Sequence, residues 1–239
     1  MDLVERLAGN PAHTALLLDV DGTLAPIVPR PQDARVPEAT RAELERLRGR
    51  YAVVACISGR TAEDARRVVG VPGLEYVGVH GLELDPESER WRGPLRQVLA
   101  AAGWPGDETD DKGVSVSFHY RRAQDEGAAR ARLEEVAVQA RAAGLVPRFG
   151  RKVLEIRPPV EADKGTAVRH LLSGRDLASA LYAGDDTTDL DAFRGLAQAD
   201  LELAVRVAVV SDEGPPELRA QADLAVDGPG GLLDLLRQL

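Results

Sequence analysis

The chain has 239 residues, 44% of them hydrophobic, which is enough to bury a core in one large domain or two small ones. Its formal net charge of −9 argues against nucleic acid or an anionic membrane as the main partner, because both require a basic surface. The sequence shows neither a signal peptide nor an apolar run of the roughly 18 residues that cross a membrane, and the single Cys56 cannot form a disulfide within the chain, so we expect a cytoplasmic protein.

The first third of the chain alternates short apolar runs with helical patterns. Apolar strands are expected over 15–18, 51–57 and 74–79, and helices over 38–50 and 60–70. Thr61 fits a cap at the start of the second helix, and Gly70 fits its end. Such alternation predicts a parallel sheet with helices between its strands.

The middle of the chain has a different pattern. Over 114–120 and 152–158 single apolar residues alternate with polar ones, and a long amphipathic helix is expected over 126–144. The alternation leaves three polar side chains on free strand faces: His119, Glu155 and Arg157. Half-exposed strands combined with helices predict an antiparallel α+β layer.

The last part of the chain returns to solid apolar runs. Strands are expected over 178–184, 205–211 and 222–228, and a final helix over 230–239. The fold class is therefore α/β, with a Rossmann-like parallel sheet in a core domain made of residues 1–83 and 160–239. Residues 84–159 are expected to form an α+β cap domain inserted in that core.

Two aspartates, Asp19 and Asp21, directly follow the first strand, where like charges repel unless a cation or phosphate chemistry needs them together. The carboxyl ends of parallel strands are where such sheets bind ligands. There Asp19 could attack a phosphate and form an acyl phosphate, Asp21 could act as general acid and base, and Mg²⁺ could offset the repulsion. A calcium loop is excluded because Arg30 stands where it needs a glutamate. This segment alone would also fit a plain surface turn.

Three later segments favour phosphate chemistry. Ser58 ends the second strand and offers a hydroxyl to a phosphate oxygen. Lys164, one of only three lysines, begins a helix, where its charge and the helix dipole both attract an anion. Asp185 and Asp186 end another strand, with Asp189 one helical turn beyond, a pattern typical of a magnesium site. Each segment alone also has an ordinary interpretation. Ser58 would fit a helix start, Lys164 a solvated lysine, and the aspartates at 185–189 a helix cap.

The order of the motifs DVDGTL, SGR, DKG and GDDTTD resembles the haloacid-dehalogenase-like phosphatases over essentially the whole chain. The resemblance implies four catalytic residues: Asp19 as nucleophile, Asp21 as general acid and base, and Ser58 and Lys164 on the phosphate. It implies a Mg²⁺ ion held by Asp19, Asp185 and the backbone carbonyl of Asp21, with Asp186 and Asp189 orienting these inner groups. The implied inserted domain is a cap of type C2B.

Within that superfamily, the segments VGVHGLEL, KGVSVSFHY and VLEIRP resemble the trehalose-6-phosphate phosphatases. This resemblance implies a set of substrate-binding residues: His80, Gly81, Lys112, His119, Glu155 and Arg157. Of these, Lys112 does not fit the strand alternation unless Gly113 interrupts the strand. The implied reaction is Mg²⁺-dependent hydrolysis of trehalose 6-phosphate to trehalose and phosphate through an aspartyl phosphate.

Other interpretations of the sequence stay open. The substrate could be sucrose phosphate or mannosyl-phosphoglycerate, and a phosphomutase would return the phosphoryl group to the substrate. A non-catalytic sugar-phosphate sensor is disfavoured because all the acids are present. The expected partner is a small sugar phosphate, with no nucleic acid and no membrane. We expect a monomer that works beside a trehalose-6-phosphate synthase.

Overall fold

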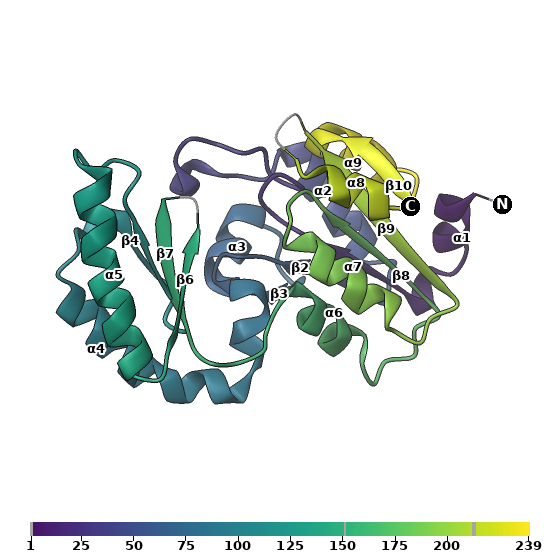
Figure 1. Cartoon of the computed structure of the whole chain (residues 1–239). Helices are drawn as coiled ribbons and strands as arrows, with labels where there is room; N and C mark the ends of the chain where they lie inside the picture. The colour runs from purple at the N-terminus through teal and green to yellow at the C-terminus, as the bar shows by residue number, and fades with distance from the viewer. Residues whose placement is uncertain (1, 151, 212–213) are drawn as a thin grey trace. The chain divides into compact units, whose positions relative to one another are not determined.

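The computed structural model describes residues 2–150, 152–211 and 214–239. The chain divides into two compact units (Figure 1), a core unit of residues 1–81 and 162–239 and an inserted unit of residues 82–161. No helix among the described residues is long and apolar enough to span a membrane.

The core unit is built on a parallel sheet. Within the described residues, six strands pair in the order β10-β9-β8-β1-β2-β3. Their bounds are β1 Thr14–Leu18, β2 Val53–Ile57, β3 Glu75–Val77, β8 Ser179–Gly184, β9 Leu203–Val210 and β10 Leu224–Asp227. The sheet therefore confirms the predicted parallel α/β core, and it places the carboxyl ends of β8, β1 and β2 next to one another.

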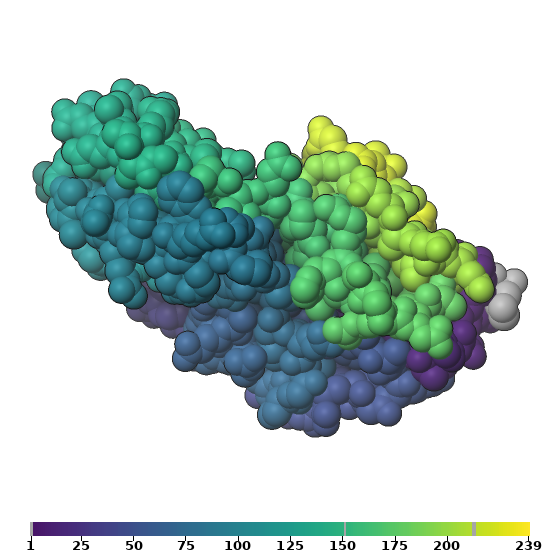
Figure 2. Space-filling view, turned by 90° about the horizontal axis from the view of Figure 1, so that it is seen from below, coloured from purple at the N-terminus to yellow at the C-terminus, as the bar shows by residue number. Residues whose placement is uncertain are grey.

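Helices cover both faces of this sheet. The α-helices of the core unit are α1 Leu3–Gly9, α2 Glu38–Arg48, α3 Ala62–Val69, α6 Lys164–Leu172, α7 Asp189–Ala197, α8 Pro216–Gln221 and α9 Gly228–Leu236. Leu16 and Leu18 of β1 share one hydrophobic cluster with residues of α1, α2, α3 and α9. On the alternate face, the ring of Tyr182 in β8 meets Phe193 of α7 edge to face, with centroids 6.1 Å apart. In Figure 2, blue segments from before the insert and green segments from after it lie side by side in the core unit.

Local signals set the ends of the helices that approach the carboxyl edge. The Thr61 side chain accepts a hydrogen bond from the Asp64 N–H at the start of α3, and Gly70 ends that helix, as predicted. Asp163 and Thr166 form a capping box at the start of α6, which makes Lys164 the first helical residue. The predicted strand 74–79 is shorter than expected, because Val79 and His80 have φ values of 48° and 53°, which a strand cannot contain.

Two glycines set the distance between α6 and α7. A Cβ atom on Gly195 would lie 2.6 Å from the Cα atom of Gly165, closer than real Cβ contacts come. The two helices thus touch through backbone, and this close approach brings together the first residue of α6, Lys164, and the first residue of α7, Asp189.

A Gly195→Ala variant is expected to destabilise the protein by about 1–3 kcal/mol, because the added methyl group must push the two backbones apart. Thermal unfolding should show this as a lowered Tm. Gly93→Ala is the matched control: Gly93 also lies in a helix, but nothing lies within 4 Å of its missing Cβ. Since alanine favours helix, the control should be neutral or stabilised by up to about 1 kcal/mol. An unchanged Tm for Gly195→Ala would contradict this account of the helix contact.

The inserted unit is an α+β layer, as predicted. Within the described residues, four antiparallel strands pair in the order β4-β5-β7-β6. Its elements are η4 Pro86–Trp91, α4 Arg92–Ala102, η5 Gly106–Glu108, β4 Thr109–Asp111, β5 Val116–His119, α5 Glu126–Ala142, β6 Val146–Gly150 and β7 Val153–Arg157. The inward-facing Phe118 and Ile156 pack with Leu133 of α5 and Leu95 of α4 in one cluster. The predicted alternation therefore describes this face correctly.

The other face of this sheet is less exposed than predicted. Asp110, Ser117, Glu155 and Arg148 lie in one cross-strand row, and Ser117 is buried because the longer side chains stand on either side of it. Arg157, which was expected on a free face, is only 8% exposed. His119 is exposed and Glu155 is half-buried, so only part of this face is open.

Candidate active site

A buried lysine lies between two buried aspartates at the carboxyl edge of the core sheet. Asp19 follows β1, and its Oδ1 atom accepts a hydrogen bond of 2.6 Å from the Lys164 ammonium group. The same ammonium group donates to Asp189 Oδ1, also at 2.6 Å. All three side chains are almost fully buried. Burial lowers the pKa of Lys164, but the charges of Asp189 and Asp19 outweigh it and raise this pKa, so the lysine stays charged.

The Asp189 carboxylate holds this part of the site together. Among the described residues, four donors converge on it: Lys164 Nζ and the Tyr182 hydroxyl on Oδ1, and the backbone N–H groups of Asp185 and Asp186 on Oδ2. A carboxylate offers about four lone-pair positions, so this one is saturated. Asp189 therefore orients Lys164 and the turn that carries Asp185, and it has no position left for a cation. Asp186 contributes its backbone here, because its side chain is exposed and accepts from the Thr187 N–H.

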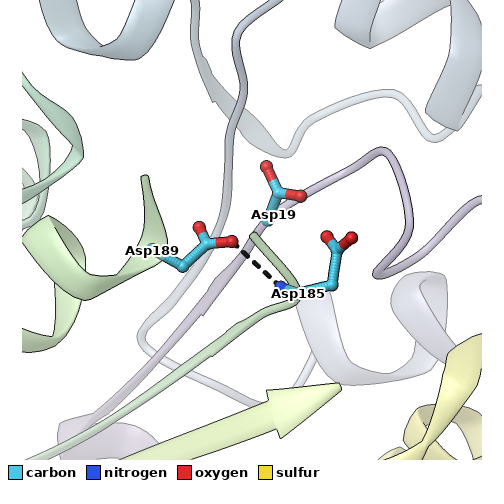
Figure 3. A group of neighbouring side chains, drawn as sticks. All are labelled: Asp19, Asp185 and Asp189. Atoms are coloured by element: carbon cyan, nitrogen blue, oxygen red, sulfur yellow. Dashed lines mark hydrogen bonds between the residues drawn. The ribbon is translucent and has the colours of Figure 1, made fainter. Parts of the chain in front are cut away.

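Asp185 lies close to Asp19 (Figure 3), and together with Asp189 they place one ligand atom each within 4.8 Å of one another. The Thr23 hydroxyl donates to Asp185 Oδ1 at 2.9 Å. Burial, with a contribution from the charge of Asp189, raises the pKa of Asp185 to about 6. Burial also raises the pKa of Asp19, and the charges of Asp189 and Asp185 add to this, although Lys164 opposes it. A cluster with this excess of negative charge fits a hard divalent cation with oxygen ligands, held by Asp19 and Asp185.

Ser58 and the loop after β3 meet at the same edge. Ser58 follows β2 and is buried, and its backbone carbonyl accepts from the His80 N–H at 2.9 Å. A Cβ atom on Gly59 would lie 2.7 Å from His80 Nε2, so the imidazole packs directly on that glycine. Gly81, with φ of 95°, lies against the carbonyl of Asp163 at the start of α6. The structure thus places His80 and Gly81 between the Ser58 loop and the Lys164 helix, next to the predicted phosphate-binding groups.

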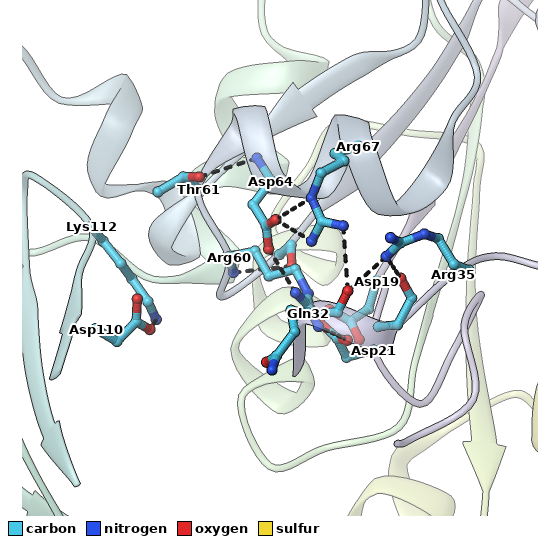
Figure 4. A network of polar contacts seen from close by, with 12 residues as sticks. Asp19, Asp21, Gln32, Arg35, Arg60, Thr61, Asp64, Arg67, Asp110 and Lys112 are labelled. Atoms are coloured by element: carbon cyan, nitrogen blue, oxygen red, sulfur yellow. Dashed lines mark hydrogen bonds and ion pairs between the residues drawn. The ribbon is translucent and has the colours of Figure 1, made fainter. Parts of the chain in front are cut away.

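Asp21 is held by an arginine to which sequence reasoning gave no role. Arg60 Nε donates to Asp21 Oδ2 and Arg60 Nη2 donates to Asp21 Oδ1, both at 2.7 Å (Figure 4). The third guanidinium nitrogen, Nη1, donates to Asp64 Oδ2 at 2.6 Å. The hydrogen bond to Asp21 is the largest of the effects that raise the pKa of Arg60, so the guanidinium group stays charged.

Four of the six predicted substrate-binding residues belong to the inserted unit: Lys112, His119, Glu155 and Arg157. Lys112 lies in the turn between β4 and β5, where Gly113 has φ of 75°, so the glycine does interrupt the strand. Lys112 Nζ lies 3.5 Å from Asp110 Oδ2, which places it on the same face as the row that contains Glu155. His119 ends β5, and Glu155 and Arg157 lie on β7.

Sequence reasoning missed three residues of this site: Thr23, Arg60 and Tyr182. Thr23 and Arg60 lie inside the motifs DVDGTL and SGR, so their proximity to the motif acids was the available signal. Tyr182 is the one aromatic residue of β8, and its buried hydroxyl needs a partner. That its partner is Asp189 depends on the packing of α7 on β8, which no local pattern contains.

Comparisons with known proteins agree with this geometry. A family model described as trehalose-phosphatase matches residues 17–229. The trehalose-phosphate phosphatase of Mycobacterium avium is 35% identical over 257 residues, covering 98% of this chain and 63% of that protein. The chain therefore spans less than two thirds of the length of this curated relative.

Two solved structures share the fold. A trehalose-6-phosphate phosphatase related protein superimposes with a TM-score of 0.73 at 24% identity, covering 93% of this chain and 95% of that one. A haloacid dehalogenase-like hydrolase from Bacteroides thetaiotaomicron superimposes with a TM-score of 0.57 at 14% identity, covering 94% and 98%. With a family model that matches most of its length, the chain belongs to the trehalose-phosphatase family, within the haloacid-dehalogenase-like fold.

Proposed function

We propose that the chain hydrolyses trehalose 6-phosphate to trehalose and phosphate. The observation that carries the proposal is the buried Asp19 carboxylate at the end of β1, hydrogen-bonded to Lys164, in a chain of the trehalose-phosphatase family. The substrate is inferred from the relative of Mycobacterium avium, whose name states trehalose phosphate.

In the proposed reaction, a carboxylate oxygen of Asp19 attacks phosphorus while the bond from phosphorus to the sugar oxygen breaks. Asp21 gives a proton to that leaving oxygen, and in the second half it takes a proton from the water that hydrolyses the aspartyl phosphate. Lys164 and the Ser58 hydroxyl bind the phosphate oxygens, and Lys164 balances the charge of Asp19 and Asp189. His80 and Gly81 support the loop that carries Ser58.

The proposed cation is Mg²⁺, because Asp19 and Asp185 are oxygen donors in a cluster with excess negative charge. Asp19, Asp185 and the backbone carbonyl of Asp21 would hold it. When bound, such an ion reduces the repulsion between the carboxylates and the incoming phosphate. Asp186 and Asp189 would act on it indirectly, through the turn that positions Asp185.

The inserted unit is proposed to recognise the sugar. Lys112, Glu155 and His119 present charged and polar groups from β5, β7 and the turn before β5, which suits the hydroxyl groups of a disaccharide. Arg157 on β7, although nearly buried, is proposed to add its guanidinium group. The proposed setting is a cytoplasmic monomer that works beside a trehalose-6-phosphate synthase.

Release of inorganic phosphate from a panel of sugar phosphates tests the proposed substrate. Trehalose 6-phosphate should be turned over with the highest kcat/KM in a panel that includes sucrose 6-phosphate, mannosyl-phosphoglycerate and glucose 6-phosphate. Preference for another member would keep the chemistry and refute the substrate. Activity that requires a sugar bisphosphate activator and releases no phosphate would instead indicate a phosphomutase.

Removal of divalent cations by EDTA is expected to lower activity at least about 100-fold, and Mg²⁺ should restore it. Asp185→Ala should raise the Mg²⁺ concentration for half-maximal activity about tenfold or more, because one of few carboxylate ligands is lost. Asp234→Ala is the control, since Asp234 pairs only with Arg237 on the surface of α9 within the contacts described. Full activity in excess EDTA would exclude the metal.

A further inference from the structure

We propose that Arg60 is a positioning residue that fixes the Asp21 carboxylate for proton transfer to the leaving oxygen. This inference rests on the proposed function, in which Asp21 is the general acid and base. The side chain of Asp21 is 34% exposed at the edge of the sheet, so a fixed orientation requires a partner that holds it.

The first observation is the geometry of the Arg60–Asp21 pair. Both carboxylate oxygens accept from the guanidinium group at 2.7 Å, one from Nε and one from Nη2. Two parallel hydrogen bonds fix the plane of the carboxylate as well as its position. They occupy one lone-pair position on each oxygen and leave the others for a proton, so the pair restricts the orientation of Asp21 without blocking it.

The second observation is that Arg60 is itself anchored. Its side chain is only 12% exposed, and Nη1 donates to Asp64 in the first turn of α3. Asp64 in turn accepts from Arg67 Nε and Nη2, at 2.9 and 2.6 Å. Figure 4 shows this series of alternating charges from Asp21 to Arg67. An arginine that is nearly buried and bonded to Asp64 can transmit the rigidity of α3 to Asp21.

The third observation is that the backbone of Arg60 belongs to the phosphate loop. Its N–H donates to Ser58 Oγ at 3.1 Å, and its carbonyl accepts from the Val79 N–H at 2.8 Å. One residue therefore links the hydroxyl proposed to bind phosphate with the carboxylate proposed to serve the leaving group. A lysine at this position would supply a point charge without the planar pair of donors, and would not fix the carboxylate plane.

The test compares two substrates that differ in their need for the acid. Trehalose 6-phosphate has an alcohol leaving group that needs a proton, whereas p-nitrophenyl phosphate has one that does not. Arg60→Met should lower kcat on trehalose 6-phosphate by on the order of 100-fold, and kcat on p-nitrophenyl phosphate by less than about fivefold. Arg60→Lys should recover only a small part of the loss. When Asp21→Asn is already present, adding Arg60→Met should lower kcat on trehalose 6-phosphate by less than about threefold further, because Arg60 acts through Asp21.

Arg206→Met is the matched control. Arg206 makes the same kind of two-point contact to Asp223 in the core unit, at 2.9 and 2.8 Å, and that pair joins β9 to the chain just before β10. This variant should lose stability comparably but keep the ratio of kcat for the two substrates unchanged. Equal losses on both substrates in Arg60→Met and Arg60→Lys, appearing mainly in KM, would overturn the proposal and make Arg60 a phosphate ligand. A loss of kcat from Arg60→Met that is as large in the Asp21→Asn background as in the wild type would also overturn the proposal.

Failure of the proposed function gives a different result. If the wild type prefers another alkyl phosphate, the substrate assignment fails. The variants are then compared on that compound and on p-nitrophenyl phosphate, and the changes in kcat described above decide the role of Arg60. If Asp21→Asn lowers kcat equally on both substrates, Asp21 is not the general acid, and the inference about Arg60 is refuted with it.

Discussion

An Asp19→Asn variant is expected to lose turnover of trehalose 6-phosphate and p-nitrophenyl phosphate alike, by on the order of 10⁴-fold or more. The amide group cannot attack phosphorus, and the choice of leaving group does not change this requirement. The result should be measured as phosphate release in single-turnover and steady-state assays with Mg²⁺ present. Activity within about tenfold of the wild type, in a folded variant, would exclude Asp19 as the nucleophile.

The fold of this variant should persist. Asparagine keeps a carbonyl oxygen that can accept from Lys164 Nζ, and Lys164 retains its ion pair with Asp189. The ionised form of Asp19 is opposed by burial and by the charges of Asp189 and Asp185, so removing its charge also relieves repulsion. We expect a free energy of unfolding within about 1.5 kcal/mol of the wild type. A lost near-ultraviolet spectrum would show that inactivity came from unfolding.

A Lys164→Met variant is expected to lose both activity and stability. Methionine fills similar space but leaves Asp19 and Asp189 buried without their shared cation, and removing one partner of a buried ion pair costs about 3–5 kcal/mol. For a chain of this length, the loss corresponds to a fall in Tm of roughly 6–20 °C. Chemical and thermal unfolding at neutral pH, followed by circular dichroism, would measure it.

The chain offers a matched control for this experiment. Lys152 also pairs with a carboxylate, Glu126, but both side chains are about half exposed. Exposed pairs contribute about 0–1 kcal/mol, so Lys152→Met should leave stability and activity nearly unchanged. A Lys164→Met variant as stable as Lys152→Met would show that the buried lysine does not balance the two aspartates.

Much of the site could be predicted from the sequence because its residues follow the ends of parallel strands. Apolar runs locate β1, β2 and β8, and Asp19, Ser58 and Asp185 come immediately after them. Strand adjacency then brings these residues together, since β1 lies between β8 and β2. The residues that hold them in place could not be predicted in the same way. The partner of Asp21 is Arg60, which is distant in sequence, and only the folded turn after β2 aims its guanidinium group back at β1.

The inserted unit shows a different limit of sequence reasoning. Period-two alternation identifies the core face of β5 and β7 correctly, because that face packs on α4 and α5 of the same unit. Alternation does not report how exposed the opposite face is. Ser117 is buried there because a small side chain stands between the longer Asp110 and Glu155, and Lys112 joins that face only because a left-handed glycine follows it. Both effects depend on neighbours in other strands or on backbone conformation.

The saturated carboxylate of Asp189 makes the state of the site observable without substrate. The amide hydrogens of Asp185 and Asp186 are both bonded to its Oδ2 atom, although the side chain of Asp186 is exposed. Exchange of these two hydrogens with solvent therefore requires the turn to leave Asp189, the same residue that holds Lys164. Their exchange rates, followed by NMR in the free protein, therefore report how often the turn that carries Asp185 separates from Asp189.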